Sequence, residues 1–451
     1  MMAKADLIDQ ILGLCPSDDL EELQKLTGEL VSHRDSPDSE RFRFESTQER
    51  CIPGYGDDLL PTWNRVLVTG GTGCVGHCVL SHLVGELPDA NLLSVARRRP
   101  ATHSRLDRVT YVSGDVRNSP RMTELMADFR PDLVIHLAAQ RNPALAEQWV
   151  DQTVSTNNLG TQVVLDAAGA AGVASVVIAS TGKAVRFFTR DVYAATKKLV
   201  EYQAAAAAKK YDGMKVSCAR FTHVVDNSLV AQNILKWIDG DEPIRLHSPL
   251  VQLPVQSALE CFQLLMVAGI VGESGRSRIV ALRDLGWPPI DLLELTLDYL
   301  ASAPRSLAPI VFTGYPAGYE AEAYPGTYDP MTAGEVSPLV NCAEAMSAAP
   351  TPVLGSSVDF FETTDVFCED LDDRLSKLTD ACRVKKNDRV IGDLLRRASE
   401  ALLQHSIEQL DSERIRRIHR LGRRHNPLVD DHAFIHRRLE ELLSTGPVAL
   451  V

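Results

Sequence analysis

The sequence lacks the long apolar runs and the paired cysteines that mark membrane proteins and secreted disulfide scaffolds. No stretch reaches the roughly 18 consecutive apolar residues of a membrane-spanning helix, and acids interrupt the apolar residues near the N-terminus, where a signal peptide has an unbroken core. The 9 cysteines include no C-x-x-C pair, and their odd number argues against a disulfide framework. We therefore expect a cytoplasmic protein with reduced thiols, without secretion or membrane insertion.

The chain also has too few basic residues for a nucleic-acid or anionic-membrane partner. Its 451 residues include 47 Lys and Arg against 60 Asp and Glu, a formal net charge of -13, whereas a phosphate backbone selects basic surfaces. His419 and His425 are too isolated from Cys or acidic ligands to predict a metal site. With 45% hydrophobic and 24% charged residues, the composition is that of a globular protein of two or three domains.

Between residues 63 and 325 the chain alternates short apolar runs with helical segments. The runs include RVLVTG from residue 65, LVIHLAA from residue 133 and SVVIAST from residue 175. Such alternation is typical of βαβ units whose parallel strands are buried on both faces. We therefore predict an α/β, Rossmann-like domain: a doubly wound parallel sheet with a smaller substrate-binding region.

The two ends of the chain differ from this pattern. Residues 1–62 predict a helical N-terminal extension, because apolar residues such as Leu7 and Ile11 have helical spacing before a polar tether. Residues 326–369 are rich in Pro, Ala, Ser and Gly and predict a linker. Residues 370–451 predict a helical C-terminal extension.

The motif VTGGTGCVG, residues 68–76, follows the first apolar run and precedes an apolar helix. Gly70 permits a tight turn, Gly73 lets the backbone approach a pyrophosphate and Gly76 allows close helix packing, while the helix N-terminus favours negative charge. An ordinary glycine turn is the alternative, but the strand and helix on either side favour dinucleotide binding.

The ends of the following strands supply further predicted contacts. Arg97, Arg98 and Arg99 end the second strand, where a basic group suits a 2′-phosphate, so NADP is favoured over NAD, with a solvated basic loop as the alternative. Asp115 closes the third strand and can meet the adenine amine, unless it only forms a turn. The predicted dinucleotide-binding residues are Gly70, Gly73, Cys74, Val75, Gly76, Arg97, Arg98, Asp115, Val116, Leu137, Ala138, Ala139, Tyr193 and Lys197.

Residues 179–198, ASTGKAVRFFTRDVYAATKK, carry a candidate catalytic set. Tyr193 and Lys197 are four apart on a predicted helix and share one face. A phenol has a reference pKa of about 10, which a neighbouring ammonium lowers, so Lys197 is placed to make Tyr193 a base. Thr181 is placed to bind the substrate hydroxyl or carbonyl. Such Tyr-Lys pairs also occur on solvated helices, but the glycine turn upstream favours catalysis.

Residues 64 to about 325 resemble an extended short-chain dehydrogenase/reductase, closest to the polysaccharide-biosynthesis branch that contains the UDP-N-acetylglucosamine 4,6-dehydratases. The motifs that carry the resemblance are TGGTGCVG, GDVRN, HLAAQRNPALAE, NNLGT, STGKAV and YAATKKLVE. The resemblance implies a dinucleotide-dependent enzyme that acts on a nucleotide sugar and forms a homo-oligomer. It also implies that Asn157 contacts the cofactor and that Arg141 and Lys183 contact the substrate.

One position departs from the family's Ser-Thr-Asp-Lys-Ala segment. In the family the Asp and Lys act as acid and base when water is eliminated from a 4-keto sugar; this sequence keeps Lys183 but has Gly182 in place of the Asp. Compared with the family, two extra residues separate Lys183 from Tyr193. The family's Arg-containing substrate loop is also replaced by a different sequence around residues 246–256. Oxidation is therefore expected and dehydration is in doubt, unless Asp191 or His223 supplies the acid; His223 is a third predicted substrate-binding residue.

Three functions remain open at this point. The first is an NADP-dependent enzyme that oxidises a sugar hydroxyl to a keto intermediate, followed by epimerisation or dehydration. The second is a dehydrogenase or reductase of another polyol or nucleoside, and the third is a non-catalytic cofactor-binding protein.

Overall fold

The computed structural model describes residues 3–15, 19–34, 47–56, 59, 63–285, 289–319, 336–341, 343–362, 368–425 and 430–445. The chain divides into two compact units. The small unit comprises Met1–Arg50, His223–Ser257 and Leu285–Ala323, and the sheet unit comprises Cys51–Thr222, Ala258–Asp284 and Tyr324–Val451.

The sheet unit is built on a nine-stranded sheet, counted over the described residues, with the order β14-β15-β11-β6-β5-β4-β1-β2-β3. Its strands are β1 (Arg65–Thr69), β2 (Asn91–Ala96), β3 (Val109–Ser113), β4 (Leu133–His136), β5 (Ser175–Thr181), β6 (Lys215–Phe221), β11 (Ser277–Leu282), β14 (Ala349–Thr351) and β15 (Gly355–Glu362). The strands from β3 to β11 pair in parallel. The order 3-2-1-4-5-6 is that of a dinucleotide-binding sheet, which confirms the predicted fold class.

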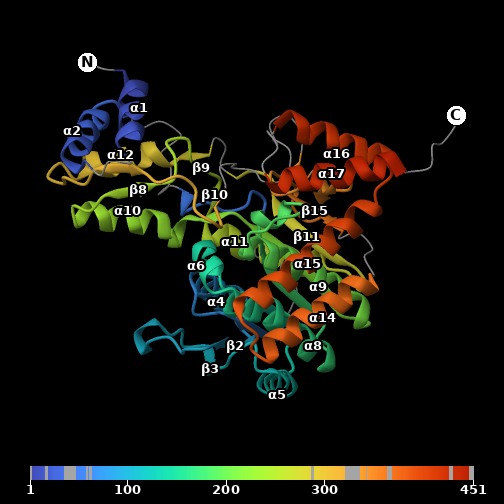
Figure 1. The fold of residues 1–451 in the computed structure, drawn as a ribbon. Helices are drawn as coiled ribbons and strands as arrows, with labels where there is room; N and C mark the ends of the chain where they lie inside the picture. The colour runs from blue at the N-terminus through green and yellow to red at the C-terminus, as the bar shows by residue number, and fades with distance from the viewer. Residues whose placement is uncertain are drawn as a thin grey trace. The chain divides into compact units, whose positions relative to one another are not determined.

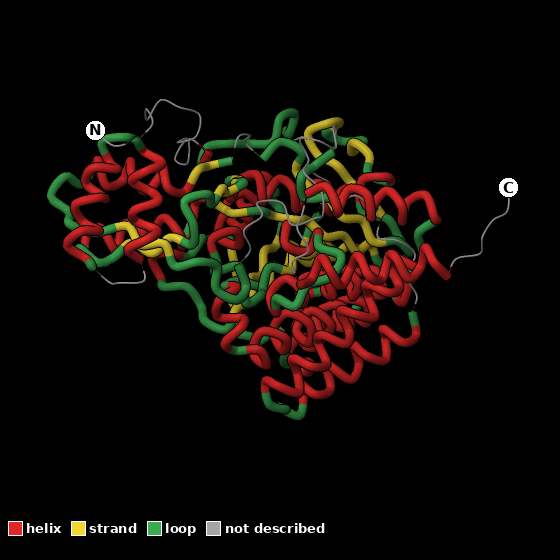
Figure 2. The backbone as a smooth tube through the Cα atoms, turned by 45° about the horizontal axis from the view of Figure 1, so that its top comes forward, coloured by secondary structure: helices red, strands yellow, loops and turns green. Residues whose placement is uncertain are grey.

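Two sets of helices cover the faces of this sheet, as Figure 2 shows with the strands in yellow between helices in red. α4 packs against α11, and α8 packs against α5 and α9. The strands are buried because neither face is left to solvent. The helices and turns between the strands are α4 (Cys74–Glu86), η4 (Thr102–Ser104), α5 (Ser119–Phe129), α6 (Pro143–Gln148), α7 (Val150–Val154), the π-helical η5 (Ser155–Leu159), α8 (Gly160–Ala170), η6 (Gly182–Val185), α9 (Val192–Lys210) and α11 (Ala258–Val271).

The C-terminal residues form the predicted helices, α14 (Glu369–Arg383), α15 (Asp388–Glu408), α16 (Ser412–His425) and α17 (Asp430–Thr445). α15 packs on α7 and α9, and α14 packs on α15 and η5, so these two helices form a further layer outside α9 (Figure 1). Phe187 and Phe188, which follow η6, are buried with Leu403, Ile415 and other apolar residues of α15, α16 and α17. The C-terminal extension is thus part of the core of the sheet unit.

The range expected to be a linker contains two strands and the turn η8 (Glu344–Met346). β15 pairs antiparallel with β11 and with β14, and it buries Val358 and Phe361. The pairing of β15 with β11 therefore gives this range a regular structure, although its composition is rich in Pro and Ser. Residues 326–335 of the expected linker lie outside the described residues.

The small unit has a core to which the N-terminal extension contributes directly. Its helices are α1 (Lys4–Leu14), α2 (Leu20–Val31), α10 (Leu229–Asp239) and α12 (Leu292–Ser302), with η7 (Val225–Asn227) before α10, and Figure 1 shows α1 and α2 beside α12. Short strands pair as β7 (His223–Val224) with β10 (Val255–Gln256), β8 (Ile244–Leu246) with β13 (Ile310–Phe312), and β9 (Gln252–Leu253) with β12 (Ile290–Asp291). Leu7 and Ile11 of α1 and Leu23, Leu26 and Leu30 of α2 share this core with α10 and α12.

The apolar spacing near the N-terminus predicted one helix and a tether, but α2 is a second helix. Asp19 caps it, because its side chain accepts a hydrogen bond from the Glu22 amide at 3.2 Å. The leucines of α2 recur at helical spacing among acids. Residues 35–46 and 60–62 of the expected extension lie outside the described residues.

Candidate active site

The turn between β1 and α4 is folded so tightly that two of its glycines leave no space for a side chain. Gly70 has a φ of 73°, and a Cβ there would lie 2.8 Å from the amide nitrogen of Ala138. A Cβ on Gly76 would lie 2.4 Å from the carbonyl oxygen of Gly70. Gly73 is the N-cap of α4 and offers no side-chain cap, so the first amides of the helix suit an anion such as a pyrophosphate.

Sequence reasoning missed a third glycine of this turn. A Cβ on Gly71 would lie 2.4 Å from the Oγ of Ser94 on β2, so a side chain here would separate β2 from the turn. The second glycine of VTGG, directly after Gly70, was the sequence feature that could have indicated this close contact. Cys74 and Val75 form the first turn of α4, next to this glycine cradle.

The ends of β2 and β3 place the predicted adenosine-side residues. Arg97, Arg98 and Arg99 follow β2 and are exposed. The Asp115 carboxylate accepts hydrogen bonds from Nε of Arg117 at 3.0 Å and from its Nη2 at 2.6 Å. This hydrogen bond is the main reason why the pKa of Asp115 lies below its ordinary value. Sequence reasoning missed Arg117, two residues away; Val116 between them is buried.

A buried histidine holds the end of β4, where Leu137, Ala138 and Ala139 begin the next loop. Nδ1 of His136 lies 2.7 Å from Oγ1 of Thr69, and its Nε2 lies 3.0 Å from Oγ1 of Thr161. Burial lowers the pKa of His136 to about 3, so the ring is neutral at physiological pH. Thr69 also accepts a hydrogen bond from the Ala138 amide at 3.3 Å. Strand β1 and helix α8 thereby fix the backbone beside the glycine turn.

Asn157 lies on the π-helical turn η5, a geometry that is frequent at functional sites. Its Oδ1 accepts a hydrogen bond from the Gln140 amide at 2.8 Å, and its Nδ2 donates to Oγ1 of Thr196 at 3.0 Å. Asn157 therefore joins the loop after β4 to helix α9. These contacts place the residue at the predicted site, but its side chain is engaged with the protein.

The strand β5 and the helix α9 bring Thr181 and Tyr193 together. Burial raises the pKa of the Tyr193 phenol, whereas hydrogen bonding by Thr181 and the positive charge of Arg141, from the loop after β4, both act to lower it. Three predicted residues from three segments thus meet at the end of the sheet.

Lys197 has a different partner from the one expected. Its Nζ donates a hydrogen bond to the carbonyl oxygen of Ala179 on β5 at 2.5 Å. Burial lowers the pKa of Lys197 to about 8. The pKa of the Tyr193 phenol lies above its ordinary value because of burial, with Thr181 and Arg141 acting against it, and its lowering by Lys197 stays a prediction.

A carboxylate that sequence reasoning missed lies at the start of α9. Glu147 on α6 accepts a hydrogen bond from the Val192 amide, with 2.7 Å between Oε1 and the nitrogen. Burial raises the pKa of Glu147, and the charge of Asp191 adds to this, while Lys183 lowers it. Glu147, the last residue of the motif HLAAQRNPALAE, thus interacts electrostatically with Lys183.

The remaining predicted residues are held in different ways. Lys183 lies on η6, and its amide nitrogen is 3.4 Å from Oγ1 of Thr181, to which it donates. Asp191 forms an ion pair with Arg186, with 3.3 Å from Nη1 to Oδ2. His223 belongs to the small unit, where its Nε2 lies 2.8 Å from Oγ of Ser228.

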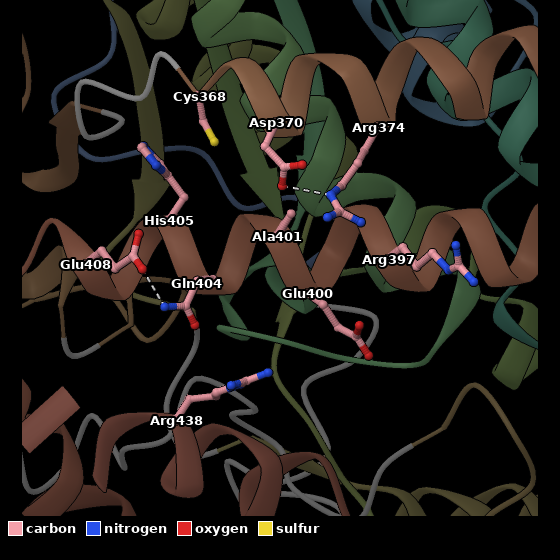
Figure 3. A pocket seen from close by; sticks show the side chains of 10 residues that line it. All are labelled: Cys368, Asp370, Arg374, Arg397, Glu400, Ala401, Gln404, His405, Glu408 and Arg438. Atoms are coloured by element: carbon pink, nitrogen blue, oxygen red, sulfur yellow. Dashed lines mark hydrogen bonds and ion pairs between the residues drawn. The ribbon is translucent and has the colours of Figure 1, made fainter. Parts of the chain in front are cut away.

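The C-terminal helices of the sheet unit form a pocket of their own. Figure 3 shows side chains of α14, α15 and α17 around it, among them Arg374, His405 and Arg438. None of the predicted site residues lines this pocket. Within the described ranges, no group of three His, Cys, Asp or Glu side chains is arranged to hold a metal ion, and none of the helices combines the length and apolarity needed to cross a membrane.

A parallel sheet with this strand order, a glycine turn after β1 and a Tyr-x-x-x-Lys helix after β5 together define an extended short-chain dehydrogenase/reductase. The model of the family described as "Polysaccharide biosynthesis protein" matches residues 66–318, and the chain belongs to this family. The recognition made from the sequence motifs is confirmed.

Curated relatives match the same part of the chain. The "Capsular polysaccharide biosynthesis protein CapD" of Staphylococcus aureus is 25% identical over 249 residues, which cover 53% of this chain and 41% of CapD. The "UDP-glucose 4-epimerase" of Rickettsia felis is 27% identical over 223 residues, 47% of this chain and 64% of the epimerase. The chain thus spans about two fifths of CapD and less than two thirds of the epimerase.

A solved structure supports the fold. "Pen from Bacillus thuringiensis" matches with a TM-score of 0.55 and 21% identity, over 68% of this chain and 88% of that one. At this level of identity the likeness concerns the fold alone.

Proposed function

We propose that this chain is an NADP-dependent enzyme that oxidises a hydroxyl group of a nucleotide-linked sugar to a keto group, which is then epimerised, dehydrated or reduced back. The observation that carries the proposal is the order of the sheet, in which β4 alone separates β1 and its glycine turn from β5. The end of β5 carries Thr181, whose side chain influences the pKa of Tyr193 on α9. The names of the relatives, a capsule-polysaccharide protein and a UDP-glucose epimerase, favour a nucleotide sugar over other polyols.

The residues of the glycine turn fit a dinucleotide. Gly70, Gly71 and Gly76 form a cradle that any Cβ would fill, at the N-terminus of α4. Leu137, Ala138 and Ala139 extend the same wall, and Arg97 with Arg98 would bind a 2′-phosphate, which is our reason for proposing NADP over NAD. When bound, the nicotinamide exchanges a hydride with the sugar carbon. Asn157 would hold the loop and helix against which the cofactor lies.

The chain's own residues supply the proton chemistry. Tyr193 is placed to take the proton of the sugar hydroxyl, and Thr181 to donate a hydrogen bond to the same sugar oxygen. The positive charge of Arg141 stabilises the phenolate, partly offsetting the burial that raises the pKa of Tyr193. Lys197, with its lowered pKa, holds the β5 backbone and is placed to donate to a bound ribose hydroxyl.

The product depends on which group moves protons at the neighbouring carbons. Lys183 is placed to act as the base, and Glu147 carries a carboxyl group whose raised pKa suits a proton donor. Gly182 has no side chain that donates a proton to a departing hydroxyl. We therefore propose epimerisation, or oxidation followed by reduction, ahead of dehydration.

Mass spectrometry of co-purified ligands, followed by incubation with a panel of UDP- and dTDP-sugars, tests the proposal. We expect bound dinucleotide and a changed sugar without added cofactor, because hydride is returned within each cycle. Net consumption of added cofactor with a free polyol would instead indicate a dehydrogenase. Dinucleotide binding without turnover of any sugar would contradict an enzymatic role.

A further inference from the structure

The absence of a side chain at position 182 has a cause in the packing around it. Gly182 does not have a positive φ, so its backbone conformation is open to any residue. However, a Cβ at this position would lie 2.7 Å from Cδ2 of Leu339. Leu339 is 4% exposed. The space that a side chain at position 182 would occupy is therefore already filled.

Leu339 belongs to a segment that we call the strap, described over residues 336–341 and 343–346. Its carbonyl oxygen accepts a hydrogen bond from Nη1 of Arg220 at 2.8 Å. Arg220 is fully buried at the end of β6, and it donates to both carboxylate oxygens of Glu201 on α9 and of Glu344 in the strap at 2.7 to 2.8 Å. Glu201 in turn accepts a hydrogen bond from Ser180 on β5 at 2.6 Å. A buried ionic network thus connects the strap to the strand and helix that carry Thr181 and Tyr193.

Two further contacts fix the strap on either side of Leu339. Asn341 donates from Nδ2 to the carbonyl oxygen of Val185 at 3.0 Å, and Val185 is the last residue of the turn η6 that begins at Gly182. Ser337 donates from Oγ to the carbonyl oxygen of Leu282 at the end of β11 at 2.6 Å. The backbone on both sides of Leu339 is therefore held in place.

The strap lies beyond residue 318, where the match to the family model ends. We propose that Leu339 is a specificity-determining residue, which occupies the place of a side chain at position 182 and puts an apolar wall beside Thr181. An acid at position 182 would have to displace a leucine that is anchored through Arg220. The consequence for the product rests on the function proposed above, whereas the packing of Leu339 against Gly182 does not.

A double-mutant cycle on the full chain tests the packing independently of activity. Gly182→Ala should lower the melting temperature by about 2 °C or more, and the same change in a Leu339→Ala background should cost at most half as much. Gly85→Ala on α4 is the matched control, because nothing lies within 4 Å of a Cβ there. If Leu339→Ala does not fold, Leu339→Val replaces it. Additive melting temperatures would overturn the proposal.

A second arm tests the effect on the product. With a UDP-sugar that the wild type accepts, Gly182→Asp combined with Leu339→Ala should raise the share of 4-keto-6-deoxy product at least about tenfold over Gly182→Asp alone. Equal shares in the two variants would overturn the role in specificity. Failure of the wild type to bind dinucleotide or change any sugar would contradict the proposed function, and the temperature cycle would still decide whether Leu339 excludes a side chain at position 182.

Discussion

At the scale of single residues, the site is governed by what burial does to ionisable groups. Tyr193 and Glu147 have raised pKa values, while Lys197 and His136 have lowered ones, and burial is the first cause in each case. Each shift favours the neutral form of the group. His136, with a pKa of about 3, is neutral near pH 7, whereas Lys197, with a pKa of about 8, keeps most of its positive charge there.

The arginines after β2 give the first prediction. Replacing Arg97 and Arg98 together by Ala should weaken NADP binding by roughly 10- to 100-fold and leave NAD binding nearly unchanged, because a charge-assisted hydrogen bond contributes about 1.5–3 kcal/mol. Titration calorimetry with both dinucleotides measures this. Arg121→Ala, which removes a partly exposed arginine of α5, is the control, and an equal loss for both cofactors would contradict the assignment.

Glu147 gives the second prediction. Its pKa is raised in the fold, so its contribution to stability is complete below the unfolded value and is lost as pH rises through the folded value. Glu147→Gln removes the buried charge and keeps an acceptor for the Val192 amide. The variant should therefore match the wild type in melting temperature near pH 4 and equal or exceed it near pH 8.

Activity provides a second readout for the same variant. If Glu147 donates or accepts a proton together with Lys183, turnover should fall by about 10²-fold or more while dinucleotide affinity stays the same. Unchanged turnover would show that Glu147 has no part in proton transfer and only accepts the hydrogen bond from the Val192 amide at the start of α9.

At the scale of elements, the strap and its ion pairs make the fold sensitive to acid. Burial alone would raise the pKa of Glu344, but Arg220 and Lys198 prevail and lower it to about 2 from an ordinary value of 4.5. A carboxylate with a depressed folded pKa contributes stability above the unfolded value, and this contribution is lost as pH falls from about 4.5 to about 2.

Glu344→Gln should therefore cost about 3 kcal/mol at pH 7 and little near pH 2, since each pKa unit corresponds to 1.36 kcal/mol. Denaturant unfolding at several pH values measures the difference. Glu124→Gln, which breaks an exposed ion pair with Arg121 on α5, is the control and should cost less than about 1 kcal/mol. An equal cost for Glu344→Gln at both pH values would refute the assigned role.

The N-terminal helices give the fourth prediction. Leu26 of α2 is 2% exposed in the core of the small unit, whereas Leu12 of α1 is 41% exposed. Leu26→Ala should destabilise the protein by about 2–5 kcal/mol, and Leu12→Ala should have little effect. Similar unfolding free energies for the two variants would show that the extension is not part of a core.

At the scale of the whole molecule, the sequence was most informative where a local rule applies. Apolar runs with parallel-sheet character predicted the strands from β1 to β6. The glycine motif predicted the tight turn after β1, and the spacing of Tyr193 and Lys197 predicted the helix α9 that follows β5. These features depend on residues close together in the chain, so the pattern alone defines them.

Contacts between distant segments were not predictable in the same way. Leu339 meets Gly182 across more than 150 residues, and β15 joins the sheet from a range whose composition indicated a linker. The partner of Lys197, the carbonyl of Ala179, also depends on how β5 and α9 pack. The homo-oligomer implied by the resemblance and the cytoplasmic location inferred from composition and cysteine pattern stay predictions.

The central claim is that Tyr193 starts an oxidation of a nucleotide-linked sugar. Its most direct test is to incubate the wild type, Tyr193→Phe and the control Tyr211→Phe with UDP-N-acetylglucosamine and UDP-glucose in deuterium oxide, and to follow the sugars by mass spectrometry. The account predicts deuterium uptake or an altered sugar for the wild type and for Tyr211→Phe, and a loss of at least about 10²-fold for Tyr193→Phe with dinucleotide still bound. Undiminished conversion by Tyr193→Phe would contradict it.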